Sequence, residues 1–413
     1  MFKYAYAPIM AWLTKVLGTK HLSLAEDIAQ ETFIKAFECW KLKGIPDNPH
    51  AWLFTVARNH AIDLLRKMKR EKRLLDENKF QLQNENDFST NSYADYSHQI
   101  FKDEQLNLMF ICCDPTIPEE SQIALILKIF CGLSTKEIAR AFRIPEETIQ
   151  KRIYRAHKAL KVAQPAIKQL STTELLKRLP VVLHILYLLF NEGYHSGKTD
   201  LPIRDELVED AMRLCWQICE SKEIDHFDSY ALMSLFCFHA SRLYGRVDEE
   251  GLLLDFKNQD RSKWNKELIK MGKTLLIKSS ERNVSNVYFF EAAISYEYCI
   301  SKRYEDIHWE NVIDGYNRLL SIQNSPHYQI QKVIALGEMH GPELGLEELN
   351  KIDDKVRKHN LVYFLAKAKW LMDLQRYQEA IEAFHNALEL TNLPAEINYI
   401  HNKITQLKKE KFD

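Results

Sequence analysis

Two short helical patterns separated by a proline lie between Gly132 and Leu160, and they restrict the fold more than any other part of the sequence. The first pattern opens with Ser134 or Thr135 followed by Glu137, which predicts a helix start closed by a capping box. Pro145 predicts the first position of a second helix, because its missing N–H needs no partner there. The stretch is therefore expected to form two consecutive helices joined by a tight turn.

The second of these helices has one apolar and one polar face. Ile149, Ile153, Ala156 and Leu160 follow one another at intervals of four, three and four, which predicts a single buried stripe. The polar face combines cations that suit phosphates with groups that hydrogen-bond or stack on bases: Gln150, Lys151, Tyr154, Arg155 and Lys158. This is the arrangement of a DNA-binding helix-turn-helix.

A plainer interpretation of the same pattern is a helical hairpin whose charges are merely solvated. Arg143 favours it slightly, since it stands where the tight turn commonly has glycine. Support for DNA binding has to come from the rest of the chain.

Composition points to a multidomain helical protein without catalysis. A chain of 413 residues should hold two to four domains, and only 12 glycines argue against a nucleotide-binding α/β fold. We find no phosphate loop, catalytic triad or ligand cluster, so no catalytic residue, cofactor or metal is expected. Eight irregularly spaced cysteines indicate reduced, buried thiols. Neither a membrane span nor a signal peptide is apparent, which predicts a cytoplasmic protein and no membrane partner.

Charge is distributed unevenly along the chain. Residues 1–75 carry thirteen Lys and Arg against seven Asp and Glu, and residues 118–165 carry nine against five. Residues 76–117 between them carry two against eight, and 76–100 lack apolar periodicity, as in a disordered tether. Two basic segments joined by an acidic connector suggest two contacts with a polyanion.

The first basic segment also predicts two helices. In the first, Leu24, Ile28, Phe37 and Phe33 or Thr32 form an apolar face, with Glu26, Asp27, Gln30 and Glu31 expected to be exposed beside it. Gly44, Pro46 and Pro49 are expected to break the helix in a loop. The second helix then turns an apolar face inward and carries many cations outward. The inward face comprises Trp52, Leu53, Val56, Ala57, Ile62 and Leu65.

Three stretches of the chain, in order, resemble regions 2 and 4 of the extracytoplasmic-function sigma factors. These proteins are promoter-recognition subunits of bacterial RNA polymerase. The three stretches are AEDIAQETFIKAF, PHAWLFTVARNHAIDLLRK and STKEIARAFRIPEETIQKRIYRAHKAL. The resemblance implies an all-α protein with sigma region 2 at 1–75, an acidic flexible linker at 76–105 and region 4 at 106–165. Core RNA polymerase and promoter DNA would be its partners.

The resemblance also implies roles for individual residues. Asp27, Gln30, Glu31 and Phe33 would dock on the clamp helices of the largest polymerase subunit. The melted strand of the minus-10 element would be held by Arg58, Asn59, Asp63, Arg66 and Lys67. The polar face from Gln150 to Lys158 would read the minus-35 element in the major groove.

Residues 166–413 form a helical extension. The stretches MFICCDPTIP, LPVVLHILYLLFNEGYHSG and LLDFKNQDRSKWN resemble a sigma subgroup whose extension is related to tetratricopeptide repeats, although Asp114 stands where that subgroup often has His. Three sets of residues repeat at steps of 33 and 35, near the period of about 34 for such repeats. The sets are Val312, Tyr316, Leu319; Gly345, Leu349, Ile352; and Ala380, Phe384, Ala387, with Ala368 before and Pro394 after the last.

Two motifs in the extension have alternative interpretations. Gly193 is expected to end a helix as a left-handed cap, which is favoured over an acid/base pair of Glu192 and His195. The polar loop from Asn258 to Trp264 is either a binding surface or an interdomain contact.

Three classes of function remain open for the whole chain. The favoured one is a sigma factor whose extension regulates it by binding a protein or a small molecule. A one-component helix-turn-helix regulator with a repeat sensor domain is the alternative, and the extension could instead be a protein-binding scaffold. A plain helical bundle is the alternative fold for the extension.

Overall fold

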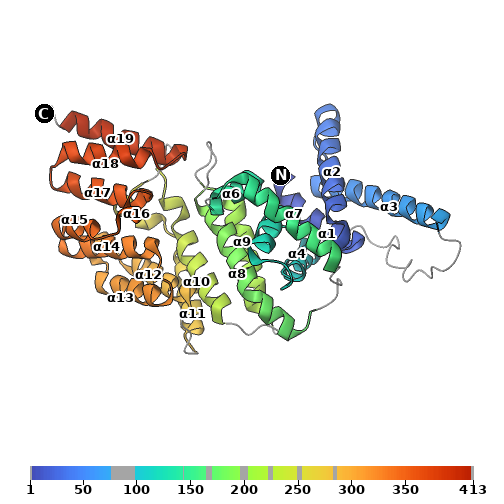
Figure 1. Cartoon of the computed structure of the whole chain (residues 1–413), viewed down its shortest axis with the longest axis horizontal. Coiled ribbons are helices and arrows are strands. Elements are labelled where there is room, and N and C mark those ends of the chain that lie inside the picture. Colours follow the sequence, from blue (N-terminus) through green and yellow to red (C-terminus); the bar gives the residue numbers. More distant parts are fainter. Residues whose placement is uncertain are drawn as a thin grey trace. The chain divides into compact units, whose positions relative to one another are not determined.

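The structure is a computed structural model that describes residues 2–75, 98–142, 144–163, 170–195, 203–221, 227–248, 254–281 and 286–410. Within these ranges every regular element is a helix, which confirms the predicted all-α class (Figure 1). None of the described helices combines the length and the apolarity needed to cross a membrane. The chain divides into two compact units, Met1–Leu189 and Phe190–Asp413.

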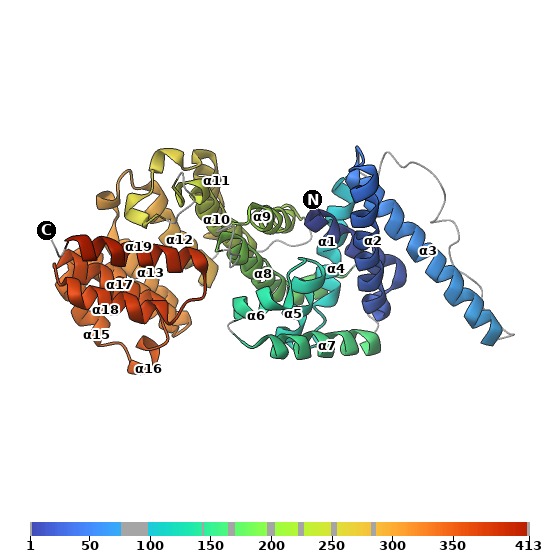
Figure 2. The ribbon, with the colours of Figure 1, turned by 90° about the horizontal axis from the view of Figure 1, so that it is seen from above.

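In its described residues, the first unit contains seven helices, one 3-10 turn and the first part of an eighth helix. Figure 2 shows α5, α6 and α7 grouped beside α4, while α3 runs outward from α1 and α2. The elements are α1 (Phe2–Leu17), η1 (Thr19–His21), α2 (Leu22–Lys43), α3 (Pro49–Leu75), α4 (His98–Cys112), α5 (Glu119–Ile129), α6 (Thr135–Phe142), α7 (Glu146–Ala163) and α8 (Thr172–Tyr194).

The turn between α2 and α3 follows from its sequence. Gly44 takes a positive φ of 80° and donates its N–H to the Trp40 carbonyl, which ends α2. Asn48 then caps α3, since its side-chain oxygen accepts from the Ala51 N–H at 3.0 Å. Pro49 occupies the first helical position, where no N–H is needed.

The helix-turn-helix pattern is formed as predicted by α6 and α7. Of the two candidate caps, Ser134 closes the box: its hydroxyl and N–H both bond the Glu137 carboxylate at 2.7 Å. The helix α7 begins at Glu146, one residue later than expected, with Pro145 just outside it. Arg143, the residue that favoured the plainer interpretation, lies outside the described residues.

The predicted linker needs a correction at its carboxyl end. Residues 76–97 lie outside the described ranges, but α4 begins at His98 and so includes residues expected to be tether. Gln105 is 2% exposed and donates from Nε2 to the Phe130 carbonyl at 2.7 Å, at the end of α5. The sequence showed no apolar period there. The burial of Gln105 could not be predicted locally, because its hydrogen-bond partner is 25 residues away.

The first unit also extends further than residue 165, the predicted end of region 4. It includes α8 as far as Leu189, with Leu179, Val182 and Leu183 fully or almost fully buried. The first helix of the expected extension therefore contributes to the core of the first unit.

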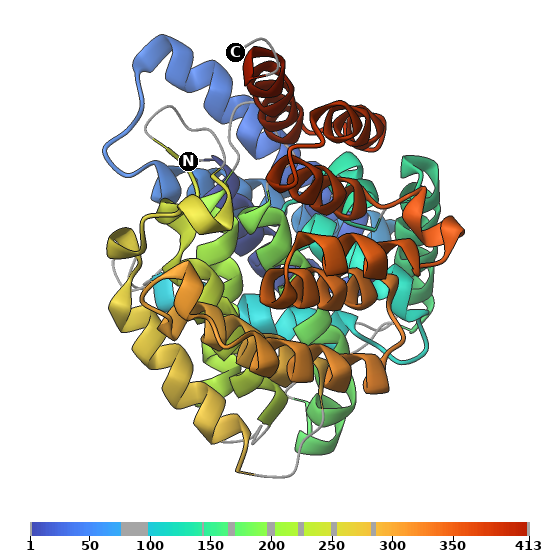
Figure 3. The same ribbon diagram turned by 90° about the vertical axis from the view of Figure 1, so that its left-hand side faces the viewer.

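The second unit consists of helices in sequence, and Figure 3 shows their order as colours from yellow (α11) through orange to dark red (α19). After the end of α8, its elements are α9 (Asp205–Glu220), α10 (Phe227–Ser241), η3 (Leu243–Gly245), η4 (Phe256–Asn258), η5 (Arg261–Lys263), α11 (Lys266–Ser279), α12 (Val287–Ile300), η6 (Tyr304–Asp306), α13 (Trp309–Ile322), α14 (Pro326–His340), α15 (Pro342–Asn350), α16 (Asp354–Arg357), α17 (Leu361–Asp373), α18 (Tyr377–Leu388) and α19 (Pro394–Glu410).

Gly193 is not the left-handed cap that the sequence suggested. It lies inside α8 without a positive φ, and a Cβ there would be 2.8 Å from the Val208 backbone nitrogen of α9. Glycine is needed for this close approach of two helices. Glu192 pairs with Arg204, whose Nη1 lies 3.6 Å from Oε1, and both side chains are buried.

The loop from Asn258 to Trp264 packs within the second unit. Trp264 is buried, and the Arg261 guanidinium lies 4.5 Å from the Trp264 ring centre. Arg261 also donates from Nη1 to the carbonyls of Tyr298 at 2.8 Å and Ser301 at 2.7 Å. These contacts anchor the loop to α12 and its carboxyl end.

A testable feature of the second unit is the seat of Trp370, which is buried against two glycines. A Cβ on Gly337 would lie 2.2 Å from this ring, and one on Gly345 would lie 2.7 Å from it. We expect Gly345→Ala to lower the free energy of unfolding by about 2 kcal/mol, because the ring has no room to move. Urea unfolding measures this loss, and the double variant Gly345→Ala/Trp370→Phe should not add the full cost of both changes. Strict additivity would contradict the steric explanation.

None of the eight cysteines, all of which the structure describes, forms a disulfide, in agreement with the expected reduced thiols. Seven are buried and Cys39 is half-buried. Burial raises the pKa of Cys112 to about 12, with Arg178 opposing the rise, so this thiol stays protonated at neutral pH.

Candidate nucleic-acid interface

The helix α7 separates its two faces as the sequence predicted. Its stripe of Ile149, Ile153, Ala156 and Leu160 is buried, whereas Tyr154 is 70% exposed. Lys151 reaches Glu147 of the same helix at 2.7 Å, and both side chains remain mostly in solvent. The other predicted readers, Gln150, Arg155 and Lys158, are exposed as well. One helix face thus presents all five side chains together.

A shallow groove of about 520 Å³ runs beside this face. Arg155 and Lys158 form part of its wall, and Thr116 joins them from the segment before α5. Ala159, Val162 and Ala163 complete a lining that is largely apolar.

The predicted minus-10 residues all lie on α3, in solvent or at its edge. Asn59, Asp63, Arg66 and Lys67 are exposed, and Arg58 is half-buried. Asp63 and Arg66 pair at 3.7 Å, an exposed contact that adds little stability. The buried side of α3 is made by Leu53, Ala57 and Ala61, while four residues expected inside, Trp52, Val56, Ile62 and Leu65, are only half-buried.

The predicted polymerase-binding residues lie on α2, where Asp27, Gln30 and Glu31 are exposed. Glu31 also lies near α3, since its Oε2 is 3.3 Å from Nδ1 of His60. Phe33 is half-buried, with its ring stacked 6.0 Å from the Tyr6 ring.

Two assignments on α2 were wrong. Phe37, expected inside, is 67% exposed and belongs to a set of exposed apolar residues that the sequence reasoning missed: Ile34, Phe37, Leu42 and Ile45. Glu26, expected in solvent, is buried at 8% exposure. Helical period alone could not reveal either one, because it does not say which parts of a helix surface other elements cover.

Glu26 connects α2 to two helices of the helix-turn-helix half. Its Oε1 lies 3.5 Å from Nζ of Lys128 on α5, and its Oε2 lies 3.3 Å from Nε2 of His157 on α7. Burial, with Lys128 nearby, lowers the pKa of His157 to about 4, so the imidazole is neutral at pH 7. Burial also raises the pKa of Glu26, against the opposing effect of Lys128. We call these three residues the Glu26 clasp.

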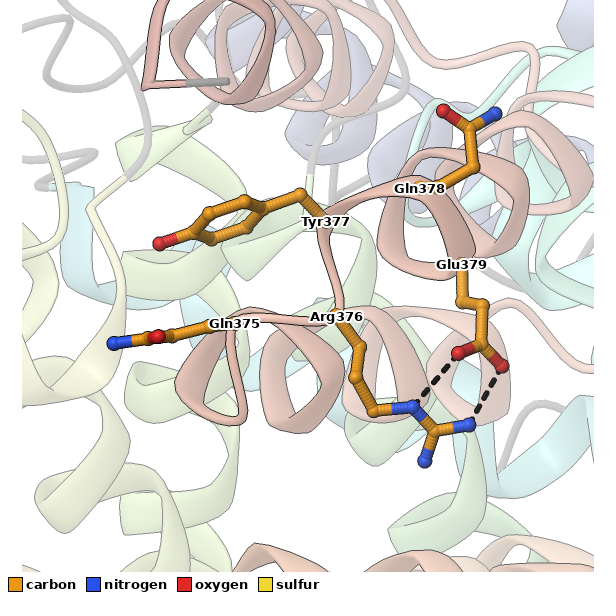
Figure 4. Close-up of a pocket in the computed structure, with 5 residues that line it drawn as sticks. All are labelled: Gln375, Arg376, Tyr377, Gln378 and Glu379. Atoms are coloured by element: carbon orange, nitrogen blue, oxygen red, sulfur yellow. Dashed lines mark hydrogen bonds and ion pairs between the residues drawn. The ribbon is translucent and has the colours of Figure 1, made fainter. Parts of the chain in front are cut away.

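A second depression, in the other unit, offers no comparable site. It surrounds the turn before α18 and is lined by residues 375–379, as Figure 4 shows. Arg376 binds Glu379 there through two hydrogen bonds of 2.7 and 2.6 Å. Across the described ranges, no three His, Cys, Asp or Glu side chains gather in a way that would hold a metal ion.

Comparisons with known protein families agree with this geometry. Residues 1–71 match the model of sigma-70 region 2, and residues 110–160 match that of sigma-70 region 4. Residues 178–280 match a family of unknown function, DUF6596.

Individual relatives cover either most of the chain or its first part. An uncharacterised protein of Rhizobium meliloti is 29% identical over 95% of this chain and 92% of its own length. The ECF RNA polymerase sigma-E factors of Salmonella typhimurium and Escherichia coli K12 are each 26% identical over 35% of this chain and 75% of their own length. No solved structure matches. With both sigma-70 regions in order and a helical extension behind them, the chain is a sigma factor whose first part is similar to the extracytoplasmic-function group.

Proposed function

We propose that this sigma factor directs core RNA polymerase to specific promoters and supports initiation, without catalysis of its own. In this proposal residues 1–75 bind the polymerase clamp and the minus-10 element, and residues 106–165 bind the minus-35 element. The stretch between these two parts connects them, and residues 166–413 regulate the other parts. The exposed basic face of α7, opposite a fully buried stripe, is the observation that carries the proposal.

The proposed polymerase contact is the exposed side of α2. Asp27 and Glu31 supply negative charge, and Ile34 and Phe37 supply apolar area on the following turns. Exposed apolar side chains beside charges are typical of a protein-binding surface. The proposed minus-10 surface is α3, where Arg66 and Lys67 would contact the backbone and Asn59 the bases of a melted strand.

The extension is proposed to be a regulatory domain of the tetratricopeptide-like kind. The repeated residues of the three sets, apart from Ile352 just after α15, fall on the second helix of successive helical pairs. The pairs are α12 and α13, α14 and α15, and α17 and α18. All of them are buried, as repeat packing requires: Gly345 lies against the Trp370 ring, and the others are apolar. A protein or a small molecule is the proposed partner of this domain.

In-vitro transcription with the full-length protein, core polymerase and a promoter library tests the proposed function. A sigma factor should select promoters only together with core enzyme. A one-component regulator would instead shift the same DNA alone at moderate salt, and that result would replace the proposal.

The Glu26 clasp suggests that the first unit, as described, is a closed state. Region 2 and region 4 touch at 3.3 Å in the clasp. The minus-10 and minus-35 elements are about 25 base pairs apart, which is roughly 85 Å along the DNA axis. The clasp therefore has to open before both elements can be bound at once.

We expect Glu26→Gln to raise the ratio of open to closed molecules roughly fivefold, because the Lys128 ammonium loses its buried counter-charge. Energy transfer between dyes at positions 35 and 158 measures this ratio in the free protein. Glu38→Gln, an exposed change on the same helix, is the matched control and should leave the ratio unchanged. Equal ratios for Glu26→Gln and wild type would refute the clasp as a lock.

A further inference from the structure

A buried guanidinium joins α8 to the end of α4. Arg178 is 9% exposed, and its Nη1 donates to the carbonyls of Phe110 at 2.9 Å and Ile111 at 3.0 Å. Both carbonyls lie in the last turn of α4, where a helix leaves such oxygens without intrahelical partners. A cation is also favoured there by the helix dipole. Arg178, which lies beyond region 4, thus caps the carboxyl end of α4.

The same side chain reaches toward the promoter-reading face through Asp114. Nη2 of Arg178 lies 3.6 Å from Oδ2 of Asp114. The other oxygen, Oδ1, accepts from the backbone N–H of Thr116 at 2.9 Å and from its hydroxyl at 2.6 Å. Thr116 lines the groove beside Arg155 and Lys158. Two side-chain contacts therefore connect α8 to the wall of that groove.

A second path runs through the first turn of α5. His184 on α8 has its Nδ1 3.7 Å from Oε1 of Glu119. The next residue, Glu120, forms an ion pair with Arg152 on α7, in which Oε2 lies 2.6 Å from Nη2. Adjacent carboxylates are thus contacted by α8 and by the recognition helix, so the segment from Asp114 to Glu120 lies between the two.

We infer that Arg178 is a positioning residue for minus-35 recognition: it fixes the segment from Asp114 to Glu120, which in turn fixes the register of α7. The inference rests on the proposed function and adds to it a residue that lies outside both matched sigma regions, since the region 4 match ends at residue 160. Arg178 itself touches no DNA in this account. It acts through Asp114 and Thr116.

The test uses full-length protein, core polymerase and a promoter selected by the wild-type protein from a randomised library. Each variant is assayed on that promoter and on a copy whose minus-35 element has been replaced. We expect Arg178→Ala to reduce the ratio of the two transcription rates about tenfold, the effect of losing a charged hydrogen-bonding group. Core-polymerase affinity should stay within about twofold, because that contact is on α2.

The ratio separates positioning from simple loss of folded protein. Misfolding lowers both rates equally and leaves the ratio unchanged, whereas a displaced recognition helix lowers only the rate that depends on the minus-35 element. Arg178→Lys keeps the charge but cannot bridge three acceptors, so it should recover part of the ratio. Lys177→Ala removes an exposed cation from the same turn and should leave the ratio at the wild-type value.

Two milder variants cover the case in which Arg178→Ala does not fold. Asp114→Asn keeps the acceptor for Thr116 but loses the ion pair, and Thr116→Val loses only the hydroxyl bond. Each should lower the ratio about threefold. Wild-type ratios in both, or in a folded Arg178→Ala, overturn the inference. Failure of the wild-type protein to transcribe with core polymerase overturns the proposed function itself.

Discussion

Charge reversal of Asp27 and Glu31 to Lys should abolish co-purification of this sigma factor with core RNA polymerase. Both side chains are exposed on α2, next to the exposed apolar residues Ile34 and Phe37. If α2 docks on a basic surface as proposed, replacing the acids sets like charges against it, which costs several kcal/mol and should weaken binding by about a hundredfold or more. The measurement is a pull-down with tagged core enzyme, followed by a titration to obtain the dissociation constant.

The same change in net charge elsewhere is the control. Glu209 and Glu382 are exposed on α9 and α18, and their reversal to Lys should leave polymerase binding unaltered. Folding should survive in the α2 variant, because the pairing of Glu31 with His60 that it removes is partly exposed and worth about 0.5 kcal/mol. If the α2 variant binds core enzyme as the wild type does, α2 is not the polymerase contact.

The double variant Lys151→Ala/Arg155→Ala should lose promoter-specific initiation while it still binds core polymerase. The two side chains are one turn apart on the exposed face of α7, where each would contact a base edge or a flanking phosphate. A good base contact contributes about 1–3 kcal/mol, so together the changes should reduce initiation at least tenfold. Run-off transcription from a selected promoter measures this loss.

Lys266→Ala/Lys270→Ala is a matched control, since it removes two exposed lysines at the same spacing from α11. It should transcribe like the wild type, apart from any effect on regulation by the extension. Undiminished initiation by the α7 variant would mean that another face reads the minus-35 element.

The features that the sequence predicted correctly are those that depend on neighbouring residues. Helical period assigned the buried stripe of α7, and its outward residues are exposed as expected. The capping box at Ser134 and the stop at Gly44 are also local, because the groups they satisfy lie within four residues. No distant part of the chain is needed to form them.

Three of the features that the sequence missed have a partner elsewhere in the chain. The position of Glu26 in the helical pattern predicts an exposed acid. It is buried because Lys128 and His157, far away in sequence, lie against it. Gly193 is placed where a cap is expected, but the approach of Val208 explains why it is glycine. Arg178 looks like one more helix cation until Phe110 and Ile111 are brought to it.

By itself, the sequence determined that the chain is helical, where a few helices of its first part begin or end, and that it carries two sigma regions in order. These follow from helical period, from caps and from motif order, which require no knowledge of packing. Only the tertiary structure decided which polar side chains are buried, that α8 helps to build the first unit, and that Arg178 caps α4. A side chain is buried only when another surface covers it. Arg178 and Ile111 are 67 positions apart in sequence, so their contact exists only in the folded chain.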